Sequence, residues 1–176
     1  VLFGQPAGQY GFLLIAAASP ILSSIADYKG NKKIFMRWFC YLGALSCSLM
    51  FFFDKSNVGF GLICFMFAGI GFYGSQVFYN SYLPDIAAEA DRDRISARGY
   101  SFGYIGSVLM QMIGFALVML MEDKALALQL TFLLVGIWWI AFAQIPLKWL
   151  PMSSRTERKS KKHVLVNGFH ELKLVW

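Results

Sequence analysis

The chain has 176 residues, of which 57% are hydrophobic, 17% aromatic and only 15% charged, with a formal net charge of +6. Soluble domains usually carry about 25% charged residues, and a soluble helix needs polar residues along one whole face. Here the charged residues lie almost wholly between long apolar runs, which excludes a water-soluble globular domain.

Five uncharged or nearly uncharged stretches follow one another, and only Arg37 interrupts them. A helix rises about 1.5 Å per residue, so about 20 residues cross a hydrocarbon core about 30 Å thick. Lipid offers the backbone no hydrogen-bond partners, and the alternating strands of a barrel would not give apolar runs this continuous. We therefore predict an all-α, polytopic transmembrane helix bundle with spans at residues 1–26, 34–53, 58–83, 99–121 and 125–147.

The first stretch, residues 1–26, is not expected to be a secretory signal. It has no starting Met, no basic leader and no short, bounded apolar core. The chain starts inside this apolar run and ends at Trp176 inside another patterned segment. We therefore expect a fragment of a longer protein.

Cysteine and histidine are not placed to bind a metal ion in this sequence. Cys40, Cys47 and Cys64 lie inside spans, at spacings that fit neither a metal site nor a disulfide framework. We expect them to pack as small apolar residues. His163 and His170 both lie in the C-terminal tail, so we expect no metal site and no cofactor.

Lys and Arg residues alternate in number from one loop to the next. Fourteen of the sixteen lie in the first loop, the third loop and the tail, whereas the other two loops carry only Lys55 and Lys124. Because Lys and Arg favour the cytoplasmic side of a membrane, we predict that residues 27–37, 84–98 and 148–176 are cytoplasmic. The membrane that we expect is a bacterial inner membrane.

Residues 151–176 are predicted to form a separate segment after the transmembrane part, residues 1–150. A run rich in Ser, Arg and Lys is typical of a solvated cytoplasmic linker, with contact to anionic lipid as a second interpretation and no nucleic acid expected. Phe169, Leu172 and Trp176 then recur at helical spacing, which predicts the start of an amphipathic helix at the membrane surface.

Two groups of glycines have a spacing that suits helix packing. The first group also matches a dinucleotide-binding loop, but that motif has meaning only between a strand and a soluble helix, and this context is absent. Small residues in membrane helices let neighbouring helices approach closely. We therefore predict helix-packing roles for Gly69, Gly71, Gly74, Gly99, Gly103 and Gly106.

Four polar side chains lie inside the third and fourth spans. Burying an amide in hydrocarbon is costly unless it pairs with another helix or lines a wet cavity. Tyr73, Gln76 and Asn80 share one helix face, and Gln111 lies midway through the next span. We predict that these four residues bind a solute; the alternative is that they only join one helix to another.

The spans contain no Asp, Glu, His or Lys that could serve in nucleophilic attack, acid–base catalysis or proton relay. An enzyme with catalytic residues in the membrane is therefore not expected. Asp27 and Asp85, near span ends, are the nearest candidates for a proton-coupling group.

The loop between the first two spans contains the sequence SSIADYKGNKK. It resembles the signature loop between helices two and three of the major facilitator superfamily, whose general pattern is G-x-L-A-D-R-x-G-R-K. Asp27, Gly30 and the lysines match the pattern, whereas Ser23, Ile25 and Tyr28 depart from it. The resemblance implies a cytoplasmic gate that is made by Asp27, Lys29, Gly30, Lys32 and Lys33.

Two further segments, FYNSYLPDI at 78–86 and ISARGYSFGYIG at 95–106, resemble one branch of this superfamily. That branch contains the vacuolar amino-acid effluxers of fungal autophagy and their uncharacterised bacterial relatives. The resemblance runs from helix two to helix six and into the central cytoplasmic loop. It implies a twelve-helix carrier whose two six-helix bundles hold the solute between them near mid-membrane.

We therefore predict a secondary transporter that moves a small polar solute by alternating access, with amino acids suggested by the resemblance. Its partners would be the solute, membrane lipid and the missing C-terminal half of the same protein. The alternative is a non-transporting membrane receptor or scaffold, which a tightly packed polar stripe and a partner-binding basic tail would favour.

Overall fold

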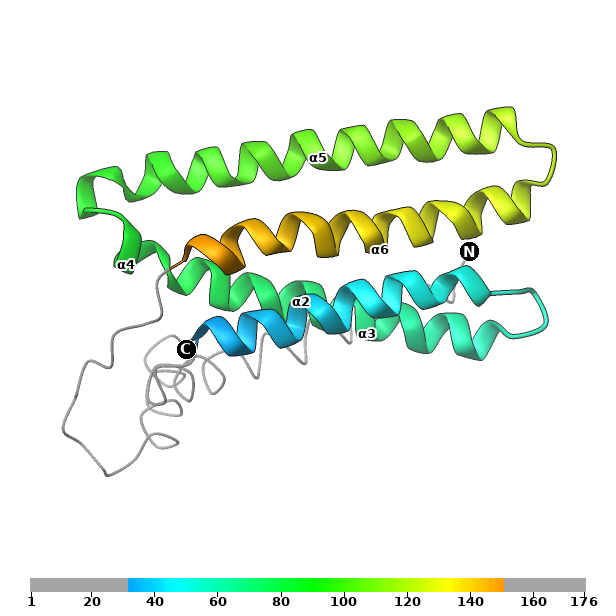
Figure 1. Cartoon of the computed structure of the whole chain (residues 1–176), viewed down its shortest axis with the longest axis horizontal. Helices are drawn as coiled ribbons and strands as arrows, with labels where there is room; N and C mark the ends of the chain where they lie inside the picture. Colours follow the sequence, from blue (N-terminus) through cyan, green and yellow to red (C-terminus); the bar gives the residue numbers. More distant parts are fainter. Residues whose placement is uncertain (1–31, 151–176) are drawn as a thin grey trace, which may run out of the picture.

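The computed structural model describes residues 32–150, and every regular element in this part is helical (Figure 1). The predicted first span, the signature loop up to residue 31 and the tail 151–176 lie outside the described residues. The elements are α2 (Lys32–Leu49), the 3-10 helix η1 (Met50–Phe52), α3 (Val58–Ser81), α4 (Leu83–Ile86), the 3-10 helix η2 (Glu89–Asp91), α5 (Arg92–Leu120) and α6 (Lys124–Trp149).

Four helical segments in this part are long and apolar enough to cross a membrane. They coincide with the second to fifth predicted spans, so the all-α transmembrane prediction is confirmed for the described residues. The segments are Lys32–Phe52, Val58–Ile86, Glu89–Leu120 and Lys124–Trp149.

Two helix starts differ from the prediction. α5 begins at Arg92, inside the predicted loop 84–98, so the three arginines of that loop lie on its first two turns. α2 begins at Lys32, inside the predicted loop 27–37. Arg and Lys are good helix formers, and a membrane helix can continue beyond the hydrocarbon. A helix start that is predicted after the last charged residue of a loop therefore makes the predicted helix too short.

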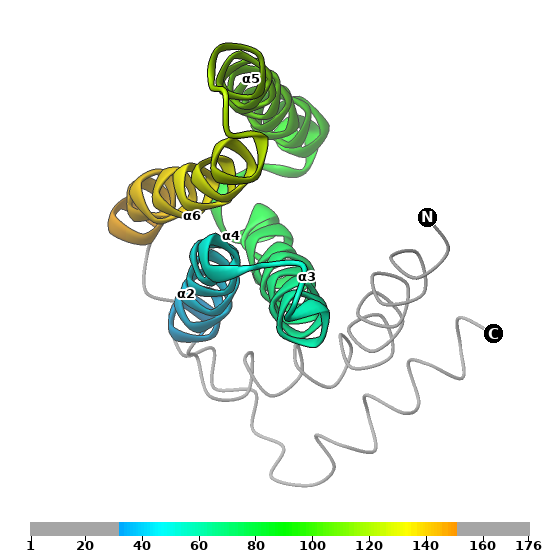
Figure 2. The same cartoon turned by 90° about the vertical axis from the view of Figure 1, so that its right-hand side faces the viewer.

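α2 lies between α3 and α6 and packs against both, whereas α5 packs mainly against α6 (Figure 2). The three helices α2, α3 and α6 share a small core of buried side chains. Partly buried aromatic rings, among them Phe39 and Trp139, pack around it. The core residues are Met36, Cys40, Phe78, Ala143 and Leu147.

The α2–α3 interface contains a close approach of the two backbones. A Cβ atom added to Gly71 of α3 would overlap the backbone of Gly43 and would lie 2.8 Å from the Phe39 carbonyl oxygen. About one turn further along α3, Gly74 faces the Phe39 ring. Larger residues at these points would push the helices apart.

α2 approaches α6 just as closely on its other side. A Cβ atom added to Gly136 of α6 would overlap the Ser48 hydroxyl and would lie 2.8 Å from the Ala44 carbonyl oxygen. Gly43 faces the ring of Trp139. The backbone of α2 is thus in close contact with both neighbours.

Local hydrogen bonds fix the turns at the end of the bundle opposite Lys32. The Asp54 carboxylate accepts from the Lys55 backbone N–H at 2.7 Å and from the Ser56 hydroxyl at 3.0 Å, and these bonds lower the pKa of Asp54. The Asp123 carboxylate caps α6 by accepting from two backbone N–H groups at 2.9 and 3.1 Å. The Lys124 ammonium donates to two carbonyl oxygens at the end of α5, each at 2.7 Å.

Replacing Gly71 with Ala should destabilise the protein, because the added methyl group would meet the backbone of α2. Overpacking of this kind costs about 1–3 kcal/mol. The matched control is Gly69→Ala on the same helix, where a Cβ atom meets nothing within 4 Å. Thermal unfolding of the purified full-length protein in detergent should show a lower midpoint for Gly71→Ala only. Equal midpoints for the two variants would contradict the close α2–α3 approach.

Candidate functional site

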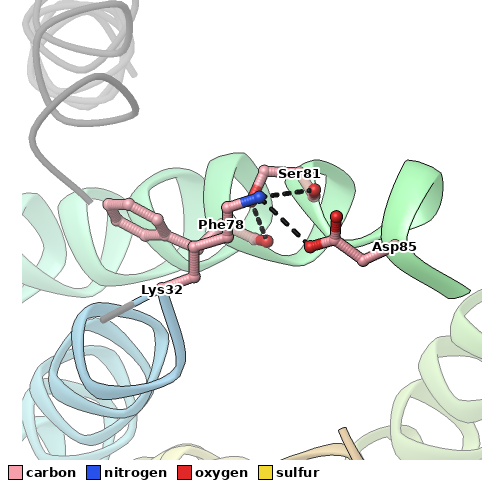
Figure 3. A network of polar contacts seen from close by, with 4 residues as sticks. All are labelled: Lys32, Phe78, Ser81 and Asp85. Carbon is pink, nitrogen blue, oxygen red and sulfur yellow. Dashed lines mark hydrogen bonds and ion pairs between the residues drawn. The ribbon is translucent and has the colours of Figure 1, made fainter. Parts of the chain in front are cut away.

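Lys32, the first residue of α2, has a buried ammonium group beside the end of α3 (Figure 3). Its Nζ lies 3.2 Å from Asp85 Oδ2 of α4 and donates to the Ser81 carbonyl oxygen at 3.3 Å. The Lys32 side chain is 11% exposed and that of Asp85 39%. A charge this far removed from water needs an opposite charge and hydrogen-bond acceptors, and Asp85 and Ser81 supply them.

Two fully buried aromatic side chains, Phe78 and Tyr82, lie next to this ion pair. Lys32 Nζ is 5.9 Å from the centroid of the Tyr82 ring, which is within the range of a cation–π contact. Phe78 stacks on Phe35 and Phe39 of α2, with centroid distances of 5.5 and 5.7 Å. The ion pair therefore lies directly at the edge of the α2–α3 core.

Lys33 joins the same end of α2 to α6. Its ammonium donates to the Leu150 carbonyl oxygen at 2.7 Å. Leu150 is the C-cap of α6, where unpaired carbonyl groups carry the negative end of the helix dipole. Two consecutive lysines thus connect one end of α2 to α4 and to α6.

Of the predicted gate residues, the structure describes Lys32 and Lys33, whereas Asp27, Lys29 and Gly30 lie outside the described residues. The acidic partner of Lys32 among the described residues is Asp85, which the sequence suggested only as a candidate for proton coupling. The two residues are 53 positions apart, so no local pattern links them. The one available signal was an acidic residue near a predicted helix end.

The predicted solute-binding residues of α3 differ in exposure. Tyr73 and Gln76 are half-buried, and Asn80 is exposed. Asn80 Nδ2 donates to the Tyr100 hydroxyl at 3.4 Å, which joins α3 to α5. Tyr73 packs edge-on against its neighbour Phe72, with 5.4 Å between ring centroids.

A second polar stripe, on α5, was not predicted from the sequence apart from Gln111. Tyr100, Tyr104, Ser107 and Gln111 follow one another at helical spacing, so they share one face of α5. Tyr104 is 71% exposed, and Gln111 is also exposed. The α3 stripe and the α5 stripe meet at the Asn80–Tyr100 bond, and both run from there toward the middle of the helices. The period of the polar residues could have revealed the second stripe.

The remaining predicted packing glycines contact their neighbours less closely than Gly71 and Gly74. A Cβ atom on Gly99 would lie 2.6 Å from the hydroxyl of Tyr79, the far end of a flexible side chain. One on Gly106 would make only ordinary contact with Trp138, at 3.7 Å. One on Gly69 or Gly103 would meet nothing within 4 Å.

No group of three His, Cys, Asp or Glu side chains that could hold a metal ion occurs among residues 32–150. The chemistry that this part of the chain offers at the α3–α5 stripes is hydrogen bonding by amides and hydroxyl groups. The chemistry that it offers at the start of α2 is the pairing of a lysine with a carboxylate.

The family of this chain follows from comparison with known proteins. The sequence profile of a family described as vacuole effluxer Atg22 like matches residues 11–92 and 87–176, which together cover most of the chain. The chain belongs to this family. Among similar proteins is the uncharacterized MFS-type transporter YxiO of Bacillus subtilis, which is 32% identical over 169 residues, covering 90% of this chain and 38% of YxiO.

Fungal members of the Atg22-like family are more distant. Autophagy-related protein 22-1 of Aspergillus terreus is 24% identical over 208 residues, covering 76% of this chain and 34% of the fungal protein. The chain thus spans little more than a third of either relative. No solved structure gives a significant match.

The resemblance to the major facilitator superfamily and to its Atg22 branch is confirmed, and the protein is an integral, multi-pass membrane protein.

In this Atg22-like chain, replacing Asp85 with Asn should be destabilising, because Lys32 would keep its buried charge and lose the ion pair with the Asp85 carboxylate. We expect a loss of about 1–3 kcal/mol, which is less than for a fully buried pair because Asp85 is partly exposed. The matched control is Asp91→Asn, which removes the exposed Arg94–Asp91 pair of 2.9 Å and should cost less than about 1 kcal/mol. Chemical unfolding of the full-length protein in detergent measures the stability of both variants, and equal losses would contradict a structural role for the Lys32–Asp85 pair.

Proposed function

We propose that the full-length protein is a secondary transporter that moves a small polar solute across the membrane by alternating access. Residues 1–150 would supply helices two to six of the N-terminal bundle of a twelve-helix carrier, and residues 151–176 the basic cytoplasmic linker. The four membrane-spanning helices and the similarity to an MFS-type transporter support this proposal.

The observation that carries the proposal is the Asn80–Tyr100 hydrogen bond, where the two polar stripes meet. One stripe is Tyr73, Gln76 and Asn80 on α3, and the other continues along α5 to Gln111. Polar side chains at membrane depth normally face a helix partner or a water-filled cavity. Asn80 has a helix partner in Tyr100, but Gln111 is exposed in the described structure, so helix packing within residues 32–150 does not account for Gln111.

The chemistry of the two stripes indicates the class of solute. Phenol hydroxyls, amides and one serine hydroxyl supply hydrogen-bond donors and acceptors, and neither stripe contains Asp, Glu, Lys or Arg. Such a surface suits a small neutral or zwitterionic solute, whose bonds to water the stripes would replace. Amino acids meet this description and are the solutes that the family resemblance suggests.

The cytoplasmic gate of this transporter would comprise Lys32 and Lys33 together with Asp27, Lys29 and Gly30. In the described arrangement, Lys32 binds Asp85 of α4, and Lys33 binds the end of α6. Ion pairs and helix-end contacts of this kind can form in one state of a carrier and break in another. The distribution of Lys and Arg supports a cytoplasmic location for this end, in a bacterial inner membrane.

Replacing Gln76 or Asn80 with Leu should lower solute flux about three- to tenfold, because each loses a hydrogen bond to the solute. The amount of folded protein in the membrane should change less than about twofold. The matched control is Gln129→Leu on α6, a half-buried amide that donates to the Phe53 carbonyl oxygen and belongs to neither stripe. Flux and abundance are measured together in vesicles that contain the full-length protein. If solute flux and protein abundance fall equally in the Gln76→Leu and Asn80→Leu variants, these amides serve folding, and the receptor or scaffold alternative gains support.

A further inference from the structure

A polar cluster lies on the exposed side of the contact between α2 and α6, apart from the two polar stripes. The Tyr41 hydroxyl of α2 lies within 3.5 Å of both polar atoms of the Gln144 side-chain amide of α6. Both residues are exposed, whereas their sequence neighbours Cys40 and Ala143 belong to the buried core. The pair therefore marks the outer edge of the α2–α6 interface.

Two basic residues extend this cluster toward one end of the bundle. Arg37 precedes Tyr41 by four residues on α2, and Lys148 follows Gln144 by four residues on α6. A spacing of four keeps each side chain on the same face of its helix. Because α2 and α6 are antiparallel, both steps lead to the end where Lys33 contacts Leu150. Each helix thus places one cation about one turn from the Tyr41–Gln144 contact, toward the same end of the bundle, and we name Arg37, Tyr41, Gln144 and Lys148 the seam cluster.

The two cations have no counter-charge within the described part of the chain. Neither Arg37 nor Lys148 makes a hydrogen bond or an ion pair with any residue from 32 to 150. Lys148 lies in the last turn of α6, where the Leu150 carbonyl oxygen accepts a hydrogen bond from Lys33. Neighbouring like charges repel, most strongly where little water surrounds them. An anion from outside this part of the chain would remove that repulsion.

The surroundings of the seam cluster are those of a membrane surface. Trp38 and Trp149 are 70% and 79% exposed, and exposed tryptophans gather at the level of lipid headgroups. The exposed Leu45 and Ile140, deeper along the same two helices, give an apolar surface suited to acyl chains. Arg37 lies four residues inside Lys33, or about 6 Å along the helix axis, so its long side chain can reach the headgroup region.

We propose that the seam cluster binds the phosphate headgroup of an anionic phospholipid of the surrounding bilayer. Arg37 and Lys148 contact the phosphate from two helices, and Tyr41 and Gln144 offer hydrogen bonds to the glycerol esters beneath it. Basic sites between membrane helices are suited to this class of lipid. The proposal does not depend on which solute the protein transports.

The test uses the full-length protein in nanodiscs of equal parts phosphatidylglycerol and phosphatidylcholine, with the lipids that stay bound counted by native mass spectrometry. We expect about fivefold or greater enrichment of phosphatidylglycerol, and its loss to within about twofold of the bulk ratio in Arg37→Gln/Lys148→Gln. The control Lys55→Gln/Arg98→Gln removes the same charge from two exposed positions outside the cluster and should keep the enrichment. Unchanged enrichment in the first variant, or equal loss in both, would overturn the proposal. Displacement of the lipid by millimolar inorganic phosphate would also overturn it, by showing a site for a soluble anion.

A second measurement leaves both cations in place. Brominated phosphatidylglycerol should quench the tryptophan fluorescence of the full-length protein more than brominated phosphatidylcholine does, because Trp38 and Trp149 flank the cluster. In Trp38→Phe/Trp149→Phe the difference between the two lipids should disappear. Equal quenching of the unsubstituted protein by both lipids would contradict binding at this position.

Discussion

The close approach of α2 to both of its neighbours is the constraint on which the rest of the described structure depends. In lipid, apolar side chains gain little by leaving their surroundings, so helices associate through close packing and polar contacts. Gly43, Gly71 and Gly136 provide that packing by letting the backbone of α2 meet α3 on one side and α6 on the other. Few buried side chains are then needed to complete the three-helix core.

This packing sets the position of the two lysines that begin α2. With the helix fixed between α3 and α6, Lys32 reaches Asp85 and Lys33 reaches Leu150, across 53 and 117 residues of chain. At the opposite end of the bundle, the polar groups of Asp54 and Asp123 bond within their own turns. That end also has one bond between distant elements, because Gln129 of α6 donates to the Phe53 carbonyl oxygen at 2.8 Å. Bonds across the chain therefore join the helices at both ends of the bundle, and the charged pair lies at the lysine end.

Much of this architecture could be predicted from the sequence, because membrane spans are defined by the absence of charge over a fixed length. The same criterion misplaced the starts of α2 and α5, since a helix continues past the hydrocarbon with residues such as Lys32 and Arg92 on its first turns. Glycine spacing indicated a packing face on α3, but it could not distinguish Gly71, which meets another backbone, from Gly69, which meets nothing. Spacing gives the face of a helix and not the neighbour that covers it.

The partners of polar groups were harder to predict than the groups themselves. Asp85 is separated from Lys32 by most of α2 and all of α3, so only the folded chain shows that they pair. Tyr100 and Tyr104 count as apolar in a span because of their aromatic rings, although their hydroxyl groups are hydrogen-bond donors. The Asn80–Tyr100 bond shows which residue of α3 the α5 stripe meets, and the period of the polar residues does not.

The most direct test of the proposed function is the flux of a pooled mixture of amino acids and other small metabolites in vesicles that contain the full-length protein. Vesicles without the protein serve as the reference, and a proton gradient is present or absent. We predict saturable flux of one or a few small neutral or zwitterionic solutes. Absence of flux of every solute, in both directions and from folded protein, would contradict the proposal that this Atg22-like protein is a transporter.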